Sequence, residues 1–150
     1  MQRATILAAV LVMGGVQFAY SQDNTYRVVE NPFQDEFDYE INSELNPMVE
    51  IDGARLTRFA ILVKGDGEIE SDKATSLTVE FSVRNTRADS AKIYVIALFE
   101  DTDGDALDRL ECSAVTVGRE RLKESSQKFK LPGNVVEATK RIYLFVEVER

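Results

Sequence analysis

The sequence contains neither histidine nor tryptophan, and the absence of histidine restricts the chemistry that the protein can use. Without histidine it cannot use a Ser-His-Asp or Cys-His catalytic arrangement, a histidine general base or a metal site built on imidazole ligands. Carboxylate chemistry, a lysine or threonine nucleophile and calcium held by oxygen ligands stay open, but none of these has a recognisable motif here. We therefore expect a protein that is not an enzyme and needs no cofactor.

Cysteine is nearly absent as well, since Cys112 is the only one in the chain. A single thiol excludes an intramolecular disulfide, so the fold has to be stabilised by burial of its core. Cys112 alternates with Leu110 and Ala114, which predicts a small buried side chain. The alternative is an exposed thiol that links two chains.

Residues 1–21 are typical of a secretory signal peptide. One positive charge, on Arg3, precedes an uncharged stretch over residues 4–19, and small residues stand at Ala19 and Ser21. The uncharged stretch is about 16 residues long, shorter than the roughly 20 residues that a membrane-spanning helix needs. We predict cleavage after Ser21, a secreted or periplasmic location, and no stable membrane anchor.

Charge is unevenly distributed along the chain, whose formal net charge is −8. Residues 22–48 carry seven acidic side chains against one basic side chain, whereas residues 119–141 carry seven basic side chains against three acidic ones. The two segments are electrostatically complementary. The first also contains the aromatic residues Tyr26, Phe33, Phe37 and Tyr39, which disordered segments usually lack. We predict that residues 22–47 form an acidic, aromatic arm that is ordered in part when docked.

After residue 48 apolar and polar residues alternate, which predicts β-strands. In residues 75–84 every second side chain is apolar: Leu77, Val79, Phe81 and Val83. Asp52-Gly53 is a dipeptide favoured in two-residue hairpin turns. Several strands separated by turns, without crossover helices, predict an all-β, Ig-like antiparallel β-sandwich of about seven to nine strands over residues 48–150.

The alternation weakens between residues 118 and 141. Residues 127–131 predict one weak strand, which ends at the turn Pro132-Gly133-Asn134. Residues 119–125 and 135–139 are compatible with short helical turns.

Two of the expected strands are apolar on both faces. The second face carries Tyr94, Ile96 and Leu98 in residues 91–99, and Tyr143 and Phe145 in residues 141–149. A two-layer sandwich does not bury this second face, so we expect either the arm or a partner, which can be a second subunit, to cover it. The candidate partner-binding residues are Phe33, Phe37, Tyr39, Tyr94, Ile96, Tyr143 and Phe145.

Residues 77–117 resemble a known family. The run Leu77-Thr-Val-Glu-Phe-Ser-Val-Arg-Asn-Thr and the later run Tyr94-Val-Ile-Ala-Leu-Phe-Glu-Asp-Thr-Asp-Gly are similar to the FxLYD-type extracytoplasmic β-sandwich domains. Asn85 corresponds to the asparagine that ends one family strand, and Leu98-Phe99-Glu100-Asp101 followed by Gly104 corresponds to the family hairpin. The resemblance implies a β-sandwich that serves as a binding or accessory module without a shared catalytic activity.

Acidic residues gather in residues 100–108, where Asp101, Asp103, Asp105 and Asp108 could supply oxygen ligands to calcium. The spacing does not match an EF-hand, because an alignment on Gly104 places Phe99 at the first ligand position. The other interpretation is a hairpin turn that uses aspartate and glycine for backbone reasons.

The sequence as a whole predicts a secreted or periplasmic, noncatalytic β-sandwich that acts by binding a protein partner or by self-association. A calcium-stabilised surface or adhesion module is one alternative, and a carboxylate-dependent glycan hydrolase is another. We expect no nucleic-acid binding, because Glu120 and Glu124 interrupt the basic residues and Phe129 is the single aromatic ring among them.

Overall fold

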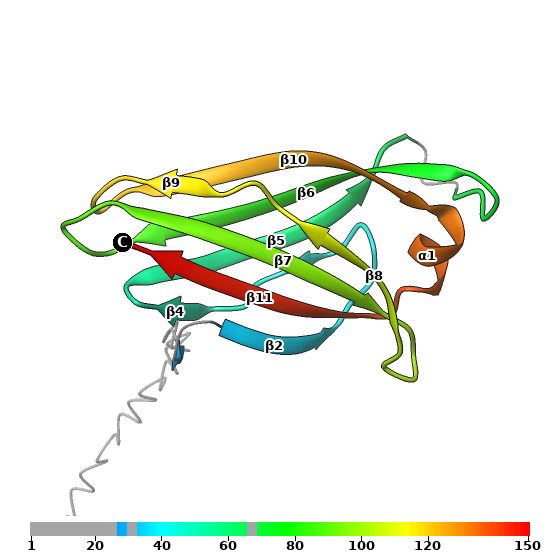
Figure 1. Ribbon diagram of the computed structural model, residues 1–150, viewed down its shortest axis with the longest axis horizontal. Coiled ribbons are helices and arrows are strands. Elements are labelled where there is room, and N and C mark those ends of the chain that lie inside the picture. Colours follow the sequence, from blue (N-terminus) through cyan, green and yellow to red (C-terminus); the bar gives the residue numbers. More distant parts are fainter. Residues whose placement is uncertain (1–26, 30–32, 66–68) are drawn as a thin grey trace, which may run out of the picture.

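The computed structural model describes residues 27–29, 33–65 and 69–150, so the predicted signal peptide lies outside the described residues. Within this part of the chain, two β-sheets face each other and one short helix lies at one end (Figure 1). The prediction of an all-β fold is confirmed. Eleven strands are described, of which eight lie within residues 48–150, in agreement with the seven to nine predicted there, and the other three precede residue 48.

In the described residues the first sheet has six strands in the order β1, β4, β5, β6 and β10, with β3 pairing against β5. Their bounds are Arg27–Val29 (β1), Glu44–Leu45 (β3), Val49–Ile51 (β4), Ala54–Val63 (β5), Ala74–Asn85 (β6) and Leu122–Pro132 (β10). The strands pair antiparallel, apart from the parallel pair of β1 and β4.

The second sheet has five strands in the order β2, β11, β7 and β8, with β9 pairing against β7 beyond the end of β8. Their bounds are Phe33–Asp38 (β2), Ala91–Glu100 (β7), Ala106–Glu111 (β8), Val115–Val117 (β9) and Arg141–Glu149 (β11). All its pairs are antiparallel. β11 and β7 are therefore the two central strands of this sheet.

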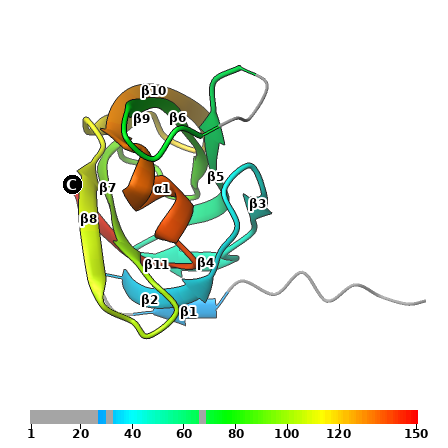
Figure 2. The same ribbon diagram turned by 90° about the vertical axis from the view of Figure 1, so that its right-hand side faces the viewer.

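The core lies between the sheets, which Figure 2 shows nearly end on. Alternate side chains of each strand point into it, as the period of two predicts. Its largest side chains are fully buried and come from both sheets: Phe59 and Phe81 from the first, Phe99 and Ile142 from the second. The inward face predicted for β6 is confirmed; its buried residues include Leu77, Val79, Phe81 and Val83.

The predicted hairpin at Asp52-Gly53 is confirmed, since these two residues join β4 to β5. Asp52 has φ = 45° and Gly53 has φ = 76°. A type I′ turn requires a positive φ at both of its central residues, which aspartate tolerates and glycine adopts readily.

The segment after residue 118 is more regular than the sequence suggests. Residues 122–132 form one long strand, β10, that pairs with β6 from Leu122↔Arg84 to Pro132↔Ala74. The expected helical turn over residues 119–125 is therefore wrong, and the weak strand expected at residues 127–131 is part of β10. Pairing with a neighbouring strand outweighs a weak local preference, which is why sequence alone misassigned this polar segment.

A short helix, α1 (Gly133–Ala138), follows β10 and lies at one end of the sandwich (Figure 2). The prediction of a helical turn here is confirmed, although the helix begins two residues before the expected range. Gly133 donates a backbone hydrogen bond of 2.7 Å to the carbonyl of Lys73. A Cβ atom at this position would overlap the carbonyl of Glu70, so the close approach requires glycine.

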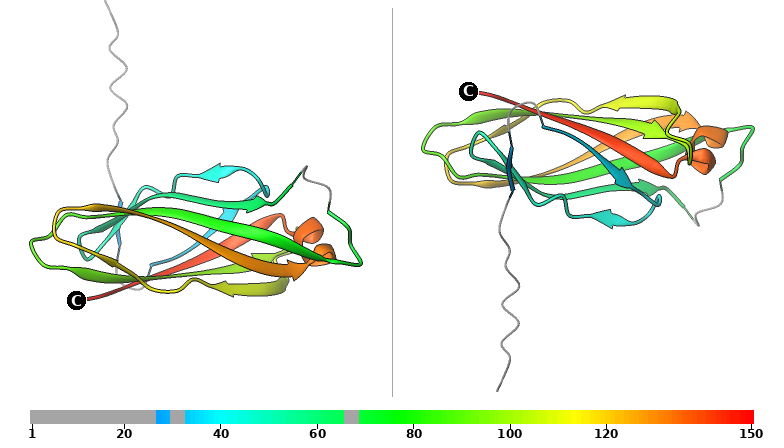
Figure 3. Two further views of the ribbon diagram at one scale, coloured as in Figure 1. Left: turned by 90° about the horizontal axis from the view of Figure 1, so that it is seen from above. Right: turned by 90° about the horizontal axis from the view of Figure 1, so that it is seen from below.

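The strands described before residue 48, β1, β2 and β3, are built into the sheets and do not lie over them. Strand β2 pairs with β11 from Asp38↔Arg141 to Phe33↔Val146, and it forms one lateral edge of the second sheet (Figure 3). Beyond it, the backbone N–H of Tyr39 donates to the carbonyl of Lys140 at 2.8 Å. The described part of the predicted arm is therefore a component of the β-sheets.

Candidate functional site

The outer face of β7 and β11 brings together four of the seven predicted partner-binding residues. In the antiparallel register Tyr143 lies opposite Leu98, and Phe145 lies opposite Ile96. The inward neighbours of these residues, such as Leu144 and Val95, are buried in the core, so the pleat points the predicted residues outward. Tyr94, Ile96, Tyr143 and Phe145 are each partly exposed. Together with Leu98, we call these residues the outer aromatic face.

Leu98 was not among the predicted binding residues, although its alternation with Tyr94 and Ile96 was visible in the sequence. It lies opposite Tyr143 and is partly exposed, as the other members of the face are. Alternation in the sequence already placed Leu98 on this face, and the register between β7 and β11 adds that Tyr143 is its neighbour there.

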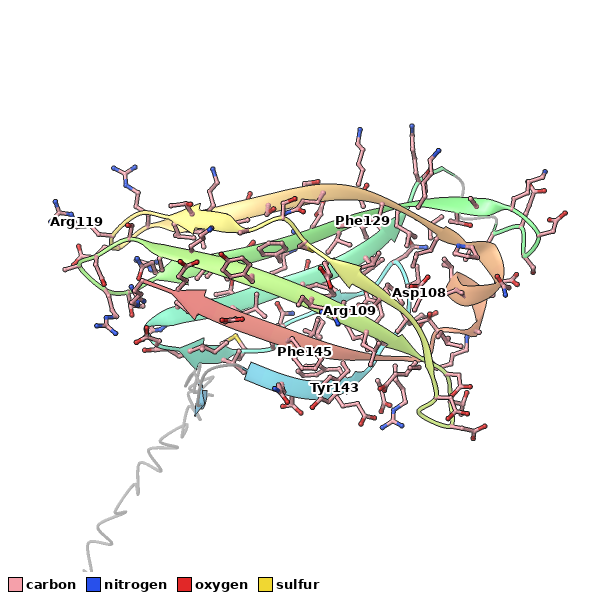
Figure 4. All side chains as sticks on the ribbon, in the orientation of Figure 1. Asp108, Arg109, Arg119, Phe129, Tyr143 and Phe145 are labelled. Carbon is pink, nitrogen blue, oxygen red and sulfur yellow. The ribbon has the colours of Figure 1, made fainter. Side chains whose placement is uncertain are left out.

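The two aromatic rings of β11 contact each other. Tyr143 and Phe145 have ring centroids 5.0 Å apart at an interplanar angle of 67°, an edge-to-face arrangement that aromatic pairs favour. Figure 4 labels both side chains along β11, and no described segment lies over them in that view. The pair therefore forms an ordered apolar centre for the outer aromatic face.

Charged residues hold Tyr94 in place at one end of this face. Its hydroxyl donates a hydrogen bond of 2.7 Å to the carboxylate of Glu149, and the ammonium of Lys92 lies 5.3 Å from the centre of its ring. The hydrogen bond from Tyr94, followed by the charge of Lys92, lowers the pKa of Glu149. Contacts with Tyr94 and then the charge of Glu149 raise the pKa of Lys92. Tyr94 thus presents a fixed ring next to an ion pair.

Ion pairs also border the face along both neighbouring strands. On β2, Glu36 pairs with Arg141, and Asp38 lies 4.0 Å from the same guanidinium. On β8, Arg109 pairs with Glu111 at 2.8 Å. An apolar centre surrounded by charged residues is the usual arrangement of a protein-binding surface.

The aromatic residues of the predicted arm do not belong to this face. Tyr39 is 5% exposed and lies in the core, and Phe37 packs against that core from its edge. The alternative in which the arm covers the outer aromatic face with Phe37 and Tyr39 is therefore wrong. The reason is that β2 adds to the edge of the sheet, so its alternate side chains enter the core beside Ile142. The side chain of Phe33 lies outside the described residues.

The acidic hairpin between β7 and β8 uses one of its carboxylates within its own turn. Asp101 accepts hydrogen bonds of 2.9 Å from the backbone N–H groups of both Asp103 and Asp105. Gly104 has φ = 86°, which suits its place in the turn. Among the described residues, no three histidine, cysteine, aspartate or glutamate side chains converge as a metal site would require. The hydrogen bonds to Asp101 explain why an aspartate stands in this turn, because its carboxylate stabilises the backbone of the turn.

Cys112 is buried, as predicted, and belongs to the hydrophobic core. Burial disfavours the thiolate and raises the pKa of Cys112 to about 11. A thiol that stays protonated and covered is a poor nucleophile. The described structure therefore assigns this cysteine to packing.

The basic segment forms a second, separate surface. A hollow of about 270 Å³ lies along β10, with Lys128, Phe129 and Lys130 on one side and Lys64 on another. Phe129 packs partly against the core. The predicted clustering of bases is thus visible, but it lies on the first sheet, away from the outer aromatic face.

The fold and the outer aromatic face define a small two-sheet β-domain with an apolar, charge-bordered surface on one sheet. No protein-family model and no curated protein matches the chain. In the part of the chain that the structure describes, no helix is long and apolar enough to cross a membrane.

Proposed function

We propose that this protein is a secreted or periplasmic, noncatalytic module with an Ig-like sandwich fold that binds a protein partner through its outer aromatic face. The proposal of export rests on the signal-peptide pattern of residues 1–21. The proposal that the module is noncatalytic rests on the absence of histidine and of any recognisable nucleophile motif. A relation to the FxLYD-type domains remains a prediction from residues 77–117.

The observation that carries the proposal is the position of Tyr143 and Phe145. Both lie on the outside of a sheet whose inner face already fills the core, and both stay partly exposed. Solvent-facing positions of a central strand are usually polar, because nothing is gained by placing aromatic rings in water. Their presence next to Ile96 and Leu98 supports a surface that is buried in a complex.

The chemistry of the face indicates what kind of partner it suits. Its centre is aromatic and aliphatic, so a partner should present apolar side chains there. Glu147 is exposed on β11 and makes no ion pair with another described residue. A partner that carries a basic residue at this border gains a complementary charge.

The test compares three forms of the full-length protein as bait for proteins in its own extracellular or periplasmic fluid. The first is the wild type, and the second is the double variant Tyr143→Thr with Phe145→Thr, which keeps strand-forming residues. The third is Leu62→Thr, a matched control on the outer face of the first sheet, where Leu62 is partly exposed. We expect wild type and control to retain the same partner and the double variant to lose it.

Each bait is first checked by thermal unfolding, so that loss of folding is not mistaken for loss of binding. Capture by all three folded baits would show that the outer aromatic face is not the binding surface. Capture by the double variant but not by Leu62→Thr would assign binding to the first sheet.

A further inference from the structure

The two complementary charged segments of the sequence lie on opposite sides of the folded protein. Strand β10 is the last strand of the first sheet and β2 is the last strand of the second, and each pairs with a single neighbour among the described strands. Figure 1 shows β10 along the top of the sandwich and β2 along the bottom, and the two views of Figure 3 agree. The basic edge and the acidic edge therefore cannot meet within one chain.

The edge formed by β10 is basic. Lys123, Lys128 and Lys130 lie on the strand, and Arg119 and Arg121 precede it. All five side chains are exposed, and none makes an ion pair with another described residue. Glu120 and Glu124 interrupt these bases, but five cations against two acids leave an excess of positive charge along this edge.

The edge formed by β2 is acidic. Glu36 and Asp38 lie on it, and Arg141 of β11 is placed beside both of them. One guanidinium faces two carboxylates there, and the side chain of Asp38 is fully exposed. An excess of negative charge therefore remains along the edge.

We propose that β10 of one molecule pairs with β2 of a second copy of this chain, so that the copies associate head to tail. An exposed edge strand offers backbone N–H and C=O groups to another strand, and strand addition is a common mode of protein recognition. The complementary charges select this pairing over pairing of like edges, because β10 against β10 and β2 against β2 bring equal charges together.

This contact is heterologous, since it joins two different surfaces. Repetition produces either a closed ring or an open chain of copies. The first sheet of one molecule then continues into the second sheet of the next. The contact uses neither Tyr143 nor Phe145, so it goes beyond the proposed function and stands or fails independently of it.

Lysines on an edge strand also have a protective role in many proteins, because they discourage unwanted pairing. The two roles make opposite predictions. Protective lysines keep the wild type monomeric at every concentration and ionic strength, whereas a charge-selected contact produces association that weakens as salt screens the charges.

The experiment is a charge exchange, read by sedimentation velocity on the purified product of the full-length sequence. One variant, Lys128→Glu with Lys130→Glu, makes the β10 edge acidic. The other, Gln34→Lys with Asp38→Lys, makes the β2 edge basic and leaves Glu36 beside Arg141. All four positions are exposed, so both variants are expected to fold, and thermal unfolding checks this.

We expect the wild type to associate increasingly with concentration at low salt, and each variant alone to associate at least about tenfold more weakly. An equimolar mixture of the two variants should recover the association, because each acidic edge then finds a basic one on the other protein. A control variant in the β7–β8 hairpin, Asp103→Lys with Asp105→Lys, changes the net charge away from both edges and should behave as the wild type does.

Three outcomes would overturn the proposal. The first is a wild type that stays monomeric at low salt and high concentration. The second is association that persists in both single-edge variants, which would place the contact elsewhere. The third is a mixture of the two variants that does not recover what each one lost.

Discussion

The hydroxyl of Tyr39 accepts a hydrogen bond of 2.6 Å from the backbone N–H of Ile61, and this bond links the two sheets through the core. Tyr39 directly follows β2 of the second sheet, whereas Ile61 lies on β5 of the first. The same hydroxyl donates to the carbonyl of Ser43 at 3.0 Å. Residues 33–39 are thereby fixed to both layers of the sandwich.

Replacing this hydroxyl should destabilise the fold. In Tyr39→Phe the N–H of Ile61 stays buried without its partner, so we expect the free energy of unfolding to fall by about 1–3 kcal/mol in urea titration. Tyr143→Phe is the matched control, because its ring is on the outer face and partly exposed. Equal stability of Tyr39→Phe and the control would contradict this account of the N-terminal segment.

Asn85 should contribute more than a typical polar residue. It is fully buried, and its amide donates to the carbonyls of Asp89 at 2.6 Å and Gly118 at 3.3 Å, while its side-chain oxygen accepts from the N–H of Arg87. Asn85→Ala leaves several buried groups unpaired, so we expect a loss of about 2–4 kcal/mol in urea titration. Asn46→Ala, at an exposed position, should change the stability by less than about 0.5 kcal/mol. A similar small effect at both sites would remove Asn85 from the determinants of the fold.

Gly133 should tolerate no side chain. The added Cβ of Gly133→Ala would overlap the carbonyl of Glu70, which is backbone and cannot move aside without shifting its loop. We expect the midpoint of thermal unfolding to fall by several degrees, for a loss of about 1–3 kcal/mol. In Gly118→Ala the nearest atom is the Cδ of Arg121 at 3.7 Å, so this control should unfold at nearly the wild-type temperature. Equal melting of the two variants would contradict the close approach.

The buried thiol of Cys112 predicts a pH dependence of stability. Its pKa is raised from an ordinary value of 9.0 to about 11 by burial, so the folded protein keeps a proton that the unfolded chain loses. This contribution is complete below pH 9 and disappears as the pH rises from 9 to 11. Relative to Cys112→Val, the wild type should therefore lose stability across this interval. Burial also raises the pKa of Tyr39, but that effect is common to both proteins and cancels. If the free energy of unfolding of the wild type and of Cys112→Val changed equally between pH 9 and 11, the burial of the thiol would be contradicted.

Asp101 should stabilise its hairpin without an ion. Its carboxylate accepts two backbone N–H groups, so Asp101→Ala should lower the free energy of unfolding by about 1 kcal/mol, and the exposed Asp103→Ala should lower it less. Thermal unfolding in millimolar calcium should match unfolding in a chelator. A melting temperature that rises with calcium and no longer does so in Asp101→Ala would support the calcium-stabilised module instead.

The central strands were predictable because each one carries its own signal. Alternation identified the inward face of β6, the dipeptide Asp52-Gly53 identified a type I′ hairpin, and the second apolar face of β7 and β11 identified Tyr94, Ile96, Tyr143 and Phe145 as unusual. These features depend on neighbouring residues in the sequence, which is why the pattern was sufficient.

The sequence failed where long-range pairing decides the structure. Residues 122–126 have no apolar alternation, yet they are strand because β6 pairs with them. One of the two alternatives placed Phe37 and Tyr39 on the wrong side of the second sheet, because their placement depends on β2 adding to the edge of β11. Alternation placed Leu98 on the outer face, but its position opposite Tyr143 depends on a register that a single sequence does not contain.

The most direct test of the central claim, that the outer aromatic face contacts another protein, is photocrosslinking in the native setting. A photoreactive benzoylphenylalanine replaces Phe145 in one form of the protein and Ala138, an exposed position of α1, in another. Irradiation should yield a discrete protein adduct from position 145 that is absent from position 138. No adduct from position 145, or the same adducts from both positions, would contradict the account.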